Sequence, residues 1–143
     1  MDQGFTFHSH YDWTDTEFET LFATATLDPQ WFSHEAHLRL AWIHLRQYGE
    51  AQAIQNIRMQ LQRFVRKVGA ADKYNETLTV AAVKAVHHFM ERSEADNFMD
   101  FMLEFPRLKH NFRELIGAHY GFNIYDSPLA RRQFLEPDLR PFT

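Results

Sequence analysis

Apolar side chains recur every three or four residues through most of this chain, a spacing typical of amphipathic α-helices. Residues 50–68 show it most clearly, because their apolar residues fall on one stripe while glutamines and arginines lie opposite. No extended stretch alternates apolar and polar side chains as a half-buried strand would. The sequence therefore predicts an all-α fold. The stripe that shows the period best comprises Ile54, Ile57, Leu61, Phe64, Val65 and Val68.

Capping and helix-breaking residues divide this pattern into separate helices. Thr14 and Glu17 are spaced as a capping box, which predicts a helix that ends near Leu27, before Asp28-Pro29. Ser33 is the expected N-cap of the next helix. The prediction is a compact bundle of about five to six helices forming a single domain, with an N-terminal arm over 1–13 and a C-terminal tail over 121–143 packed on the bundle. The expected helices cover residues 14–27, 33–48, 50–68, 75–92, 94–104, 109–118 and, within the tail, 128–135.

Composition narrows the function classes. A chain of 143 residues suits one domain with a real core, and its lack of cysteine excludes disulfide scaffolds, thiolate zinc sites and cysteine nucleophiles. The net charge of −4 argues against nucleic-acid binding. No apolar run approaches the roughly 20 residues that span a membrane, and the first residues lack the layout of a secretory signal. We therefore expect a cytoplasmic protein with no nucleic-acid or membrane partner.

His34 and His37 are the first candidate site residues. They lie three residues apart on a helix whose polar face is narrow, so both are expected to point into the protein. Side chains at this spacing are roughly 5–6 Å apart, close enough for two imidazoles to share a metal ion. The spacing is one residue short of the zinc-protease pattern HExxH, which excludes that class. Buried histidines that merely bond backbone carbonyls are an equally good interpretation, and both stay open.

Glu76 is the second candidate. It lies in the first turn of the helix over 75–92, where a carboxylate is favoured by the positive end of the helix dipole. That structural role is the preferred interpretation from the residues alone. The functional alternative is a metal ligand or general base, because a buried carboxylate needs a cation or hydrogen-bond donors.

Three segments of the chain are similar to a family of small uncharacterised bacterial proteins. They are residues 32–42 (FSHEAHLRLAW), 74–79 (YNETLT) and 134–142 (FLEPDLRPF). The family pattern reads H-x-x-H-L-R-x-A-W, then Y-H-E-T-L-T, then E-P-D-L-x-P, and the resemblance spans most of the chain. It implies that His34, His37 and Glu76 act together as a ligand set for zinc or non-haem iron. Asn75 stands where the pattern has histidine, which implies a weakened or altered site if that histidine is a ligand.

The resemblance has one further implication, and the position of the aromatic residues leads to a separate expectation. Arg39, which belongs to the first block, is expected to pair with a carboxylate of the tail, either Glu136 or Asp138. The aromatic residues near the candidate ligands are expected either to wall a pocket for a small organic molecule or to be ordinary core. These aromatics are Trp31, Phe32, Trp42 and Tyr74.

The sequence leads to two functional hypotheses from different classes of protein. The first is a metal-binding helical-bundle protein holding one divalent ion, zinc or iron, and acting as a small metal-dependent enzyme on an organic small molecule. The second is a non-catalytic interaction module that forms a homodimer through its aromatic-rich helices. A non-covalent haem pocket with one axial histidine is a third interpretation, without an attachment motif to support it. The self-association hypothesis depends on a helix that is apolar on several sides, with Phe98, Met99, Phe101, Met102 and Phe105.

Overall fold

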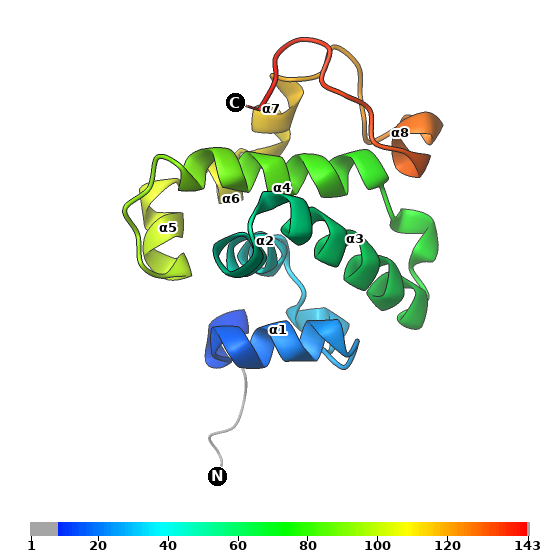
Figure 1. The fold of residues 1–143 in the computed structure, drawn as a ribbon. Helices are drawn as coiled ribbons and strands as arrows, with labels where there is room; N and C mark the ends of the chain where they lie inside the picture. Colours follow the sequence, from blue (N-terminus) through cyan, green and yellow to red (C-terminus); the bar gives the residue numbers. More distant parts are fainter. Residues whose placement is uncertain (1–8, 143) are drawn as a thin grey trace.

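The computed structural model describes residues 9–142, and within them the secondary structure is entirely helical (Figure 1). The all-α prediction is confirmed. Helices α2, α3 and α4 pack against one another, with α1 against the side of α2 and α3 away from α4. The elements are η1 (His10–Asp12), α1 (Asp15–Ala23), η2 (Pro29–Trp31), α2 (His34–Tyr48), α3 (Glu50–Lys67), η3 (Ala71–Lys73), α4 (Glu76–Met90), α5 (Phe98–Glu104), α6 (Arg107–His110), α7 (Phe112–Gly117) and α8 (Pro128–Arg132).

The central helices begin and end where their capping residues predict. The Ser33 hydroxyl accepts a hydrogen bond from the Ala36 amide at the start of α2, and Asn75 Oδ1 accepts one from the Leu78 amide at the start of α4. Gly49 has a φ of +84°, which glycine adopts easily, so the chain leaves α2 and enters α3 without a loop.

Several boundaries differ from the predicted ones, and α8 ends at Arg132 instead of Leu135. Helix α1 ends at Ala23 instead of Leu27, because Ala25 adopts a positive φ of 56° and the chain turns back. Helix α5 begins at Phe98 behind its N-cap Asn97, later than predicted. The single helix predicted over 109–118 is two short helices, α6 and α7, because Asn111 between them, with φ −131° and ψ 31°, departs from helical geometry.

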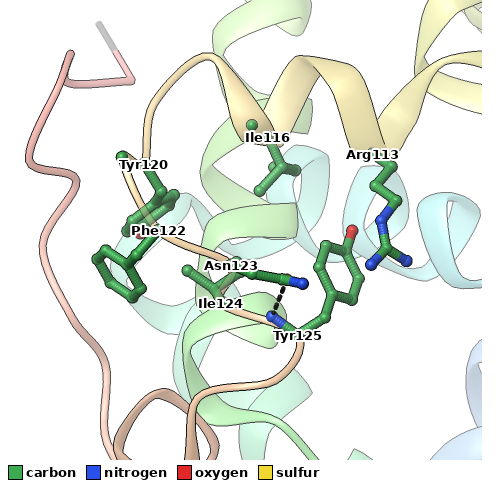
Figure 2. Close-up of a pocket in the computed structure, with 9 residues that line it drawn as sticks. Arg113, Ile116, Tyr120, Phe122, Asn123, Ile124 and Tyr125 are labelled. Carbon is green, nitrogen blue, oxygen red and sulfur yellow. Dashed lines mark hydrogen bonds between the residues drawn. The ribbon is translucent and has the colours of Figure 1, made fainter.

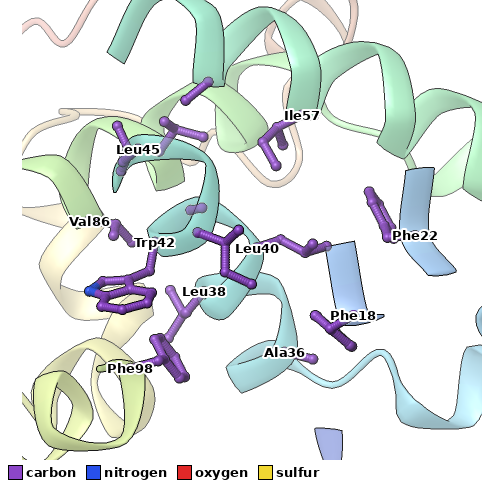
Figure 3. Packing of buried hydrophobic residues seen from close by; sticks show 14 of the residues in the cluster. Phe18, Phe22, Ala36, Leu38, Leu40, Trp42, Leu45, Ile57, Val86 and Phe98 are labelled. Atoms are coloured by element: carbon purple, nitrogen blue, oxygen red, sulfur yellow. The ribbon is translucent and has the colours of Figure 1, made fainter. Parts of the chain in front are cut away.

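The larger hydrophobic core is formed by α1 to α6 (Figure 3). Phe18 and Phe22 of α1 are buried in this core, and the ring centroid of Phe22 lies 5.2 Å from that of Phe64 of α3. Trp42 of α2 packs edge-on against Phe98 of α5, with ring centroids 6.0 Å apart. Burial of one such aromatic side chain is worth about 1.5–3 kcal/mol. A smaller cluster joins α4 to α7, α8 and the tail and comprises Ala81, Ala85, Ile116, Tyr120, Ile124 and Ala130.

Most of the large apolar side chains of residues 94–105 are buried within this chain. Phe98, Phe101 and Met102 are buried in the larger core. Met99 and Leu103 remain 51% and 75% exposed on α5. Self-association through this helix stays a prediction, and these two side chains are the ones on which it now depends.

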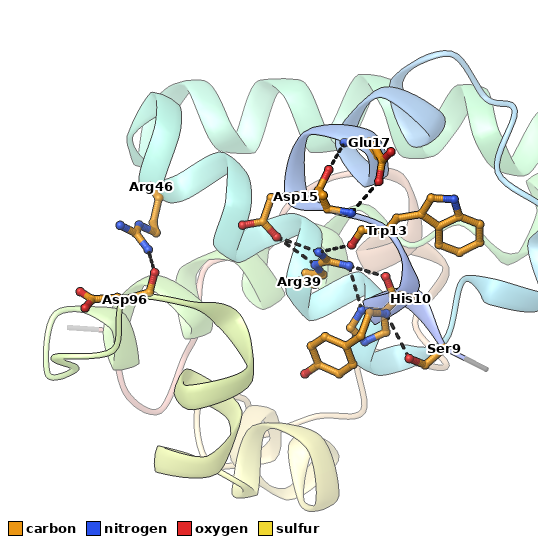
Figure 4. A network of polar contacts seen from close by, with 10 residues as sticks. Ser9, His10, Trp13, Asp15, Glu17, Arg39, Arg46 and Asp96 are labelled. Carbon is orange, nitrogen blue, oxygen red and sulfur yellow. Dashed lines mark hydrogen bonds and ion pairs between the residues drawn. The ribbon is translucent and has the colours of Figure 1, made fainter. Parts of the chain in front are cut away.

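Arg39 is a buried cation that fastens the N-terminal segment to α2 (Figure 4). Its Nη2 donates to Asp15 Oδ1 and to the Trp13 carbonyl, both at 2.8 Å, and its Nη1 donates to the His10 carbonyl. The expected pairing with Glu136 or Asp138 is wrong, because Arg39 lies on the face of α2 that meets residues 10–15. Of the predicted arm, residues 9–13 are thus held against the bundle, while residues 1–8 lie outside the described part.

The tail is held by side chains from the first turn of α4. Asn75 Nδ2 donates to the Ile124 carbonyl at 2.9 Å. The Thr77 hydroxyl, fully buried, donates to the Gln133 carbonyl at 2.7 Å and accepts from the Leu135 amide at 3.0 Å. The segment over 74–79 therefore caps α4 and binds the backbone of the tail. Within residues 9–142, no helix has the length and apolar character needed to cross a membrane.

Candidate functional site

The first turn of α2 opens onto a small pocket between α2 and α4. His34 and His37 both line this pocket, which has a volume of about 140 Å³. An apolar cavity of about 150 Å³ is large enough to hold a benzene-sized molecule. The pocket is therefore of the right size for a single aromatic ring. Its other walls are apolar or aromatic and comprise Leu38, Ala41, Leu78, Ala82, Phe112 and Tyr125.

One ring nitrogen of His37 has no hydrogen-bond partner among the described residues. This atom, Nε2, is covered from solvent. Burial, with a smaller contribution from His34, lowers the pKa of His37 to about 4, so the ring is neutral near pH 7. A neutral imidazole has one donor and one acceptor nitrogen. His37 thus lines the pocket and keeps one ring nitrogen without a hydrogen-bond partner among the described residues.

His34 is placed differently, although it lines the same pocket. Its side chain is exposed, and its Nε2 lies 3.0 Å from the Leu108 carbonyl. Because a carbonyl only accepts, this nitrogen is the donor, and Nδ1 is the nitrogen left without a hydrogen bond among the described residues. The ring also packs against Phe112, with centroids 4.8 Å apart. His34 therefore joins α2 to the α6–α7 region and is not the inward-pointing residue that the helix pattern predicts.

Glu76 lies at a different surface of α4. Its Oε2 is 2.5 Å from Arg58 Nε, and its Oε1 accepts a hydrogen bond from the Tyr74 hydroxyl at 2.6 Å. Burial, followed by this contact with Glu76, raises the pKa of Tyr74 to about 12. Glu76 is indeed buried, as its functional interpretation supposes, and its cation is an arginine. It lines a separate hollow of about 490 Å³ with Arg58, Lys84 and Arg132.

The structure therefore brings His34 and His37 together and leaves Glu76 out of their pocket. Among residues 9–142, no three histidine, aspartate or glutamate side chains are grouped so that they could hold a metal ion. Asn75, at the position of the family's histidine, caps α4 and bonds Ile124.

Two aromatic walls of the pocket were not predicted. Phe112 belongs to α7, and Tyr125 belongs to the tail, which shows no helical period from which its inward side chains could be read. Tyr125 also lines a larger hollow of about 350 Å³ (Figure 2). There the guanidinium carbon of Arg113 lies 4.0 Å from the centroid of the tyrosine ring. Tyr125 is thus a wall shared by the interior pocket and this outer hollow. The one available signal is the aromatic enrichment that follows Gly121.

The predicted aromatic wall is mostly core. Trp42 packs on Phe98, and Tyr74 bonds Glu76. Trp31 packs edge-on against Trp13. Phe32 contacts the site, with its ring centroid 5.1 Å from that of His37.

Comparison with known proteins gives no further guide to the site. No family model, curated protein or solved structure matches the chain. The resemblance to small bacterial proteins stays a prediction, and the geometry of the pocket is what supports a function.

Proposed function

We propose that this protein binds a small, mostly apolar organic molecule in the pocket between α2 and α4, and that His37 recognises its one polar group. The supporting observations are that His37 lines an apolar pocket and that its covered Nε2 has no hydrogen-bond partner among the described residues. A buried polar atom without a partner is costly, by about 1–3 kcal/mol, and a ligand that bonds it removes that cost.

The pocket favours a ligand of the size and polarity of phenol. Its volume of about 140 Å³ accommodates one ring, and its apolar walls give such a ring van der Waals contact. The neutral form of His37 matches an uncharged hydroxyl, which can donate to Nε2 or accept from it. Charged ligands are disfavoured, because the lining holds no carboxylate and no lysine or arginine.

The test compares phenol with toluene by calorimetric titration. We expect phenol to bind more tightly, by roughly three- to tenfold, because a neutral hydrogen bond contributes about 0.5–1.5 kcal/mol. The His37→Leu variant should lose this preference and still bind toluene. The matched control is His110→Leu, an exposed histidine of α6 outside the pocket. Failure of both ligands to saturate the wild type, or an unchanged preference in His37→Leu, would contradict the proposal.

A divalent metal ion, zinc or iron, is the second candidate occupant. What favours it is the placement of two imidazoles on successive turns at one pocket, one of them with a free Nε2. His34 would have to exchange its bond to the Leu108 carbonyl for the metal, and Glu76 would have to leave Arg58. A metal with an open position would act as a Lewis acid on an organic substrate, the enzymatic form of this proposal.

Elemental analysis of tag-free protein separates the two occupants. Near-stoichiometric zinc or iron that is lost in the His34→Ala, His37→Ala double variant would support the metal, whereas no metal in either protein would exclude it. For either function we propose a cytoplasmic location, which cell fractionation would test.

A further inference from the structure

A separate hollow lies where the tail crosses α4, α6 and α7. It has a volume of about 220 Å³, and the described residues that line it include four basic side chains and no acidic one. These are His88 of α4, Arg107 of α6, His119 just after α7, and Arg140 of the tail. Such a concentration is notable in a chain whose net charge is −4. The hollow shares no lining residue with the His37 pocket.

The two histidines are oriented by the backbone of the tail. His88 Nδ1 lies 3.1 Å from the Phe142 carbonyl, and His119 Nδ1 lies 2.8 Å from the Arg140 carbonyl. His119 Nδ1 must carry the proton, because a carbonyl only accepts. His88 Nδ1 carries it when it donates to Phe142, the shorter of its two contacts; the other is to Arg92 Nη1, at 3.3 Å. The ring of His119 is also stacked on Phe142, with centroids 4.1 Å apart. Both imidazoles are therefore fixed in place, and each keeps its Nε2 for another contact.

Within residues 9–142, neither Arg107 nor Arg140 makes a side-chain hydrogen bond or ion pair. Each guanidinium carries five N–H donors in a planar fork that matches the oxygens of a phosphate. Glu91, whose charge acts on His88, has an oxygen 3.6 Å from His87 Nε2. The described lining of the hollow thus holds donors and positive charge without a counter-charge.

The remaining walls are apolar. Phe89, Leu115 and Phe142 line the hollow beside the basic groups. An inorganic ion would leave these apolar side chains in contact with water. An organic substituent on the anion would cover them, which is favourable.

We propose that this hollow binds a phosphate monoester. Its dianionic phosphoryl group contacts the guanidinium groups of Arg107 and Arg140 and the Nε2 side of the two histidines, and its organic part lies on Phe89, Leu115 and Phe142. The number of basic groups around one centre favours a dianion over a carboxylate. The site is completed by the tail, which supplies Arg140 and Phe142 and so gives the block over 134–142 a role in binding.

The test is calorimetric titration at constant ionic strength with three probes: phenyl phosphate, inorganic phosphate and benzoate. We expect phenyl phosphate to saturate one site and to bind several-fold more tightly than either of the other two. The Arg107→Gln, Arg140→Gln double variant should weaken phenyl phosphate by about tenfold or more. Both arginines are exposed, so the fold should survive, and circular dichroism checks this.

Two control variants make the result specific. Arg66→Gln, Lys67→Gln removes the same charge from the exposed surface of α3 and should leave binding unchanged. His37→Leu should also leave it unchanged, which shows that the phenyl ring does not occupy the other pocket. The proposal is overturned by the absence of saturable phenyl phosphate binding, by an equal loss in the α3 control, or by benzoate binding as tightly as phenyl phosphate.

Discussion

Protonation of His37 would place a positive charge on a ring whose Nε2 is sealed from water. Its pKa is about 4 in the folded protein and near the ordinary value of 6.5 in the unfolded chain. Between these values the unfolded chain binds the extra proton and the folded protein does not. The free energy of unfolding therefore decreases as the pH falls through this window, and is unaffected by His37 above it.

We expect the free energy of unfolding to fall by up to about 3 kcal/mol between pH 6.5 and 4 on account of His37 alone, since each pKa unit corresponds to about 1.4 kcal/mol. Urea denaturation across this range measures it. In His37→Leu the fall should be smaller, and the remaining part comes from His10 and His44, whose pKa values burial also lowers. His110→Leu should behave as the wild type. An identical pH dependence in His37→Leu would contradict this assignment.

A second prediction at the residue scale concerns Arg39. Arg39→Lys should reduce the free energy of unfolding by about 2–4 kcal/mol, because one ammonium group cannot reach Asp15 and the carbonyls of His10 and Trp13 together. Asp15→Asn should cost less, about 1 kcal/mol, because Asp15 is half exposed. Thermal or chemical denaturation of the two variants gives the comparison. Equal losses would mean that the ion pair, and not the bonds to the carbonyls, holds the N-terminal segment.

At the scale of elements, the contact between α4 and the tail through the Thr77 hydroxyl can be removed by a single substitution. Thr77→Val keeps the shape of the side chain and removes the hydroxyl, so the Gln133 carbonyl and the Leu135 amide lose their partner. We expect a loss of about 2 kcal/mol and faster hydrogen exchange at the Leu135 amide. Thr79→Val is the matched control, since this hydroxyl is also buried but donates to the Asn75 carbonyl within α4. Exchange at Leu135 that accelerates equally in both variants would contradict a specific role for Thr77.

The sequence predicts α2 and α3 well because their boundaries are encoded locally, by Ser33, Gly49 and an uninterrupted apolar stripe. It predicts the path of the tail poorly because that path depends on hydrogen bonds between residues far apart in the chain, such as Thr77 and Gln133. The early end of α1 has no proline or glycine to signal it; it rests on the positive φ of Ala25.

For the candidate site too, the sequence predicts what is encoded locally and not what depends on contacts between distant parts of the chain. The spacing of His34 and His37 places them at one pocket, which is local information. On α4, residues two apart are separated by about 200° around the helix, so Glu76 and Leu78 cannot face the same neighbour. Only tertiary packing determines which of those faces meets α2, and it is the face of Leu78.

At the scale of the whole molecule, the two hydrophobic clusters share α4. Val83 and Val86 belong to the larger cluster, and Ala81 and Ala85 to the smaller one. Because one helix supplies both, loss of either cluster removes packing from the other. The tail and the bundle should therefore unfold together.

Two optical signals test this cooperativity. All three tryptophans, Trp13, Trp31 and Trp42, contact the larger cluster, so their fluorescence reports on it, whereas far-ultraviolet circular dichroism reports on every helix. We expect the two denaturation curves of the wild type to coincide. Helix loss at lower denaturant than the fluorescence change would show that the tail and its cluster separate first.

The way in which α4 holds the tail also has a consequence for engineering. Asn75 and Thr77 form hydrogen bonds to main-chain atoms of the tail, those of Ile124, Gln133 and Leu135. The attachment is therefore independent of which side chains these three tail residues carry. Gln133 is itself exposed. Its side chain can therefore be exchanged for a fluorophore, a crosslinker or a randomised residue of a display library, while the backbone beneath it stays anchored.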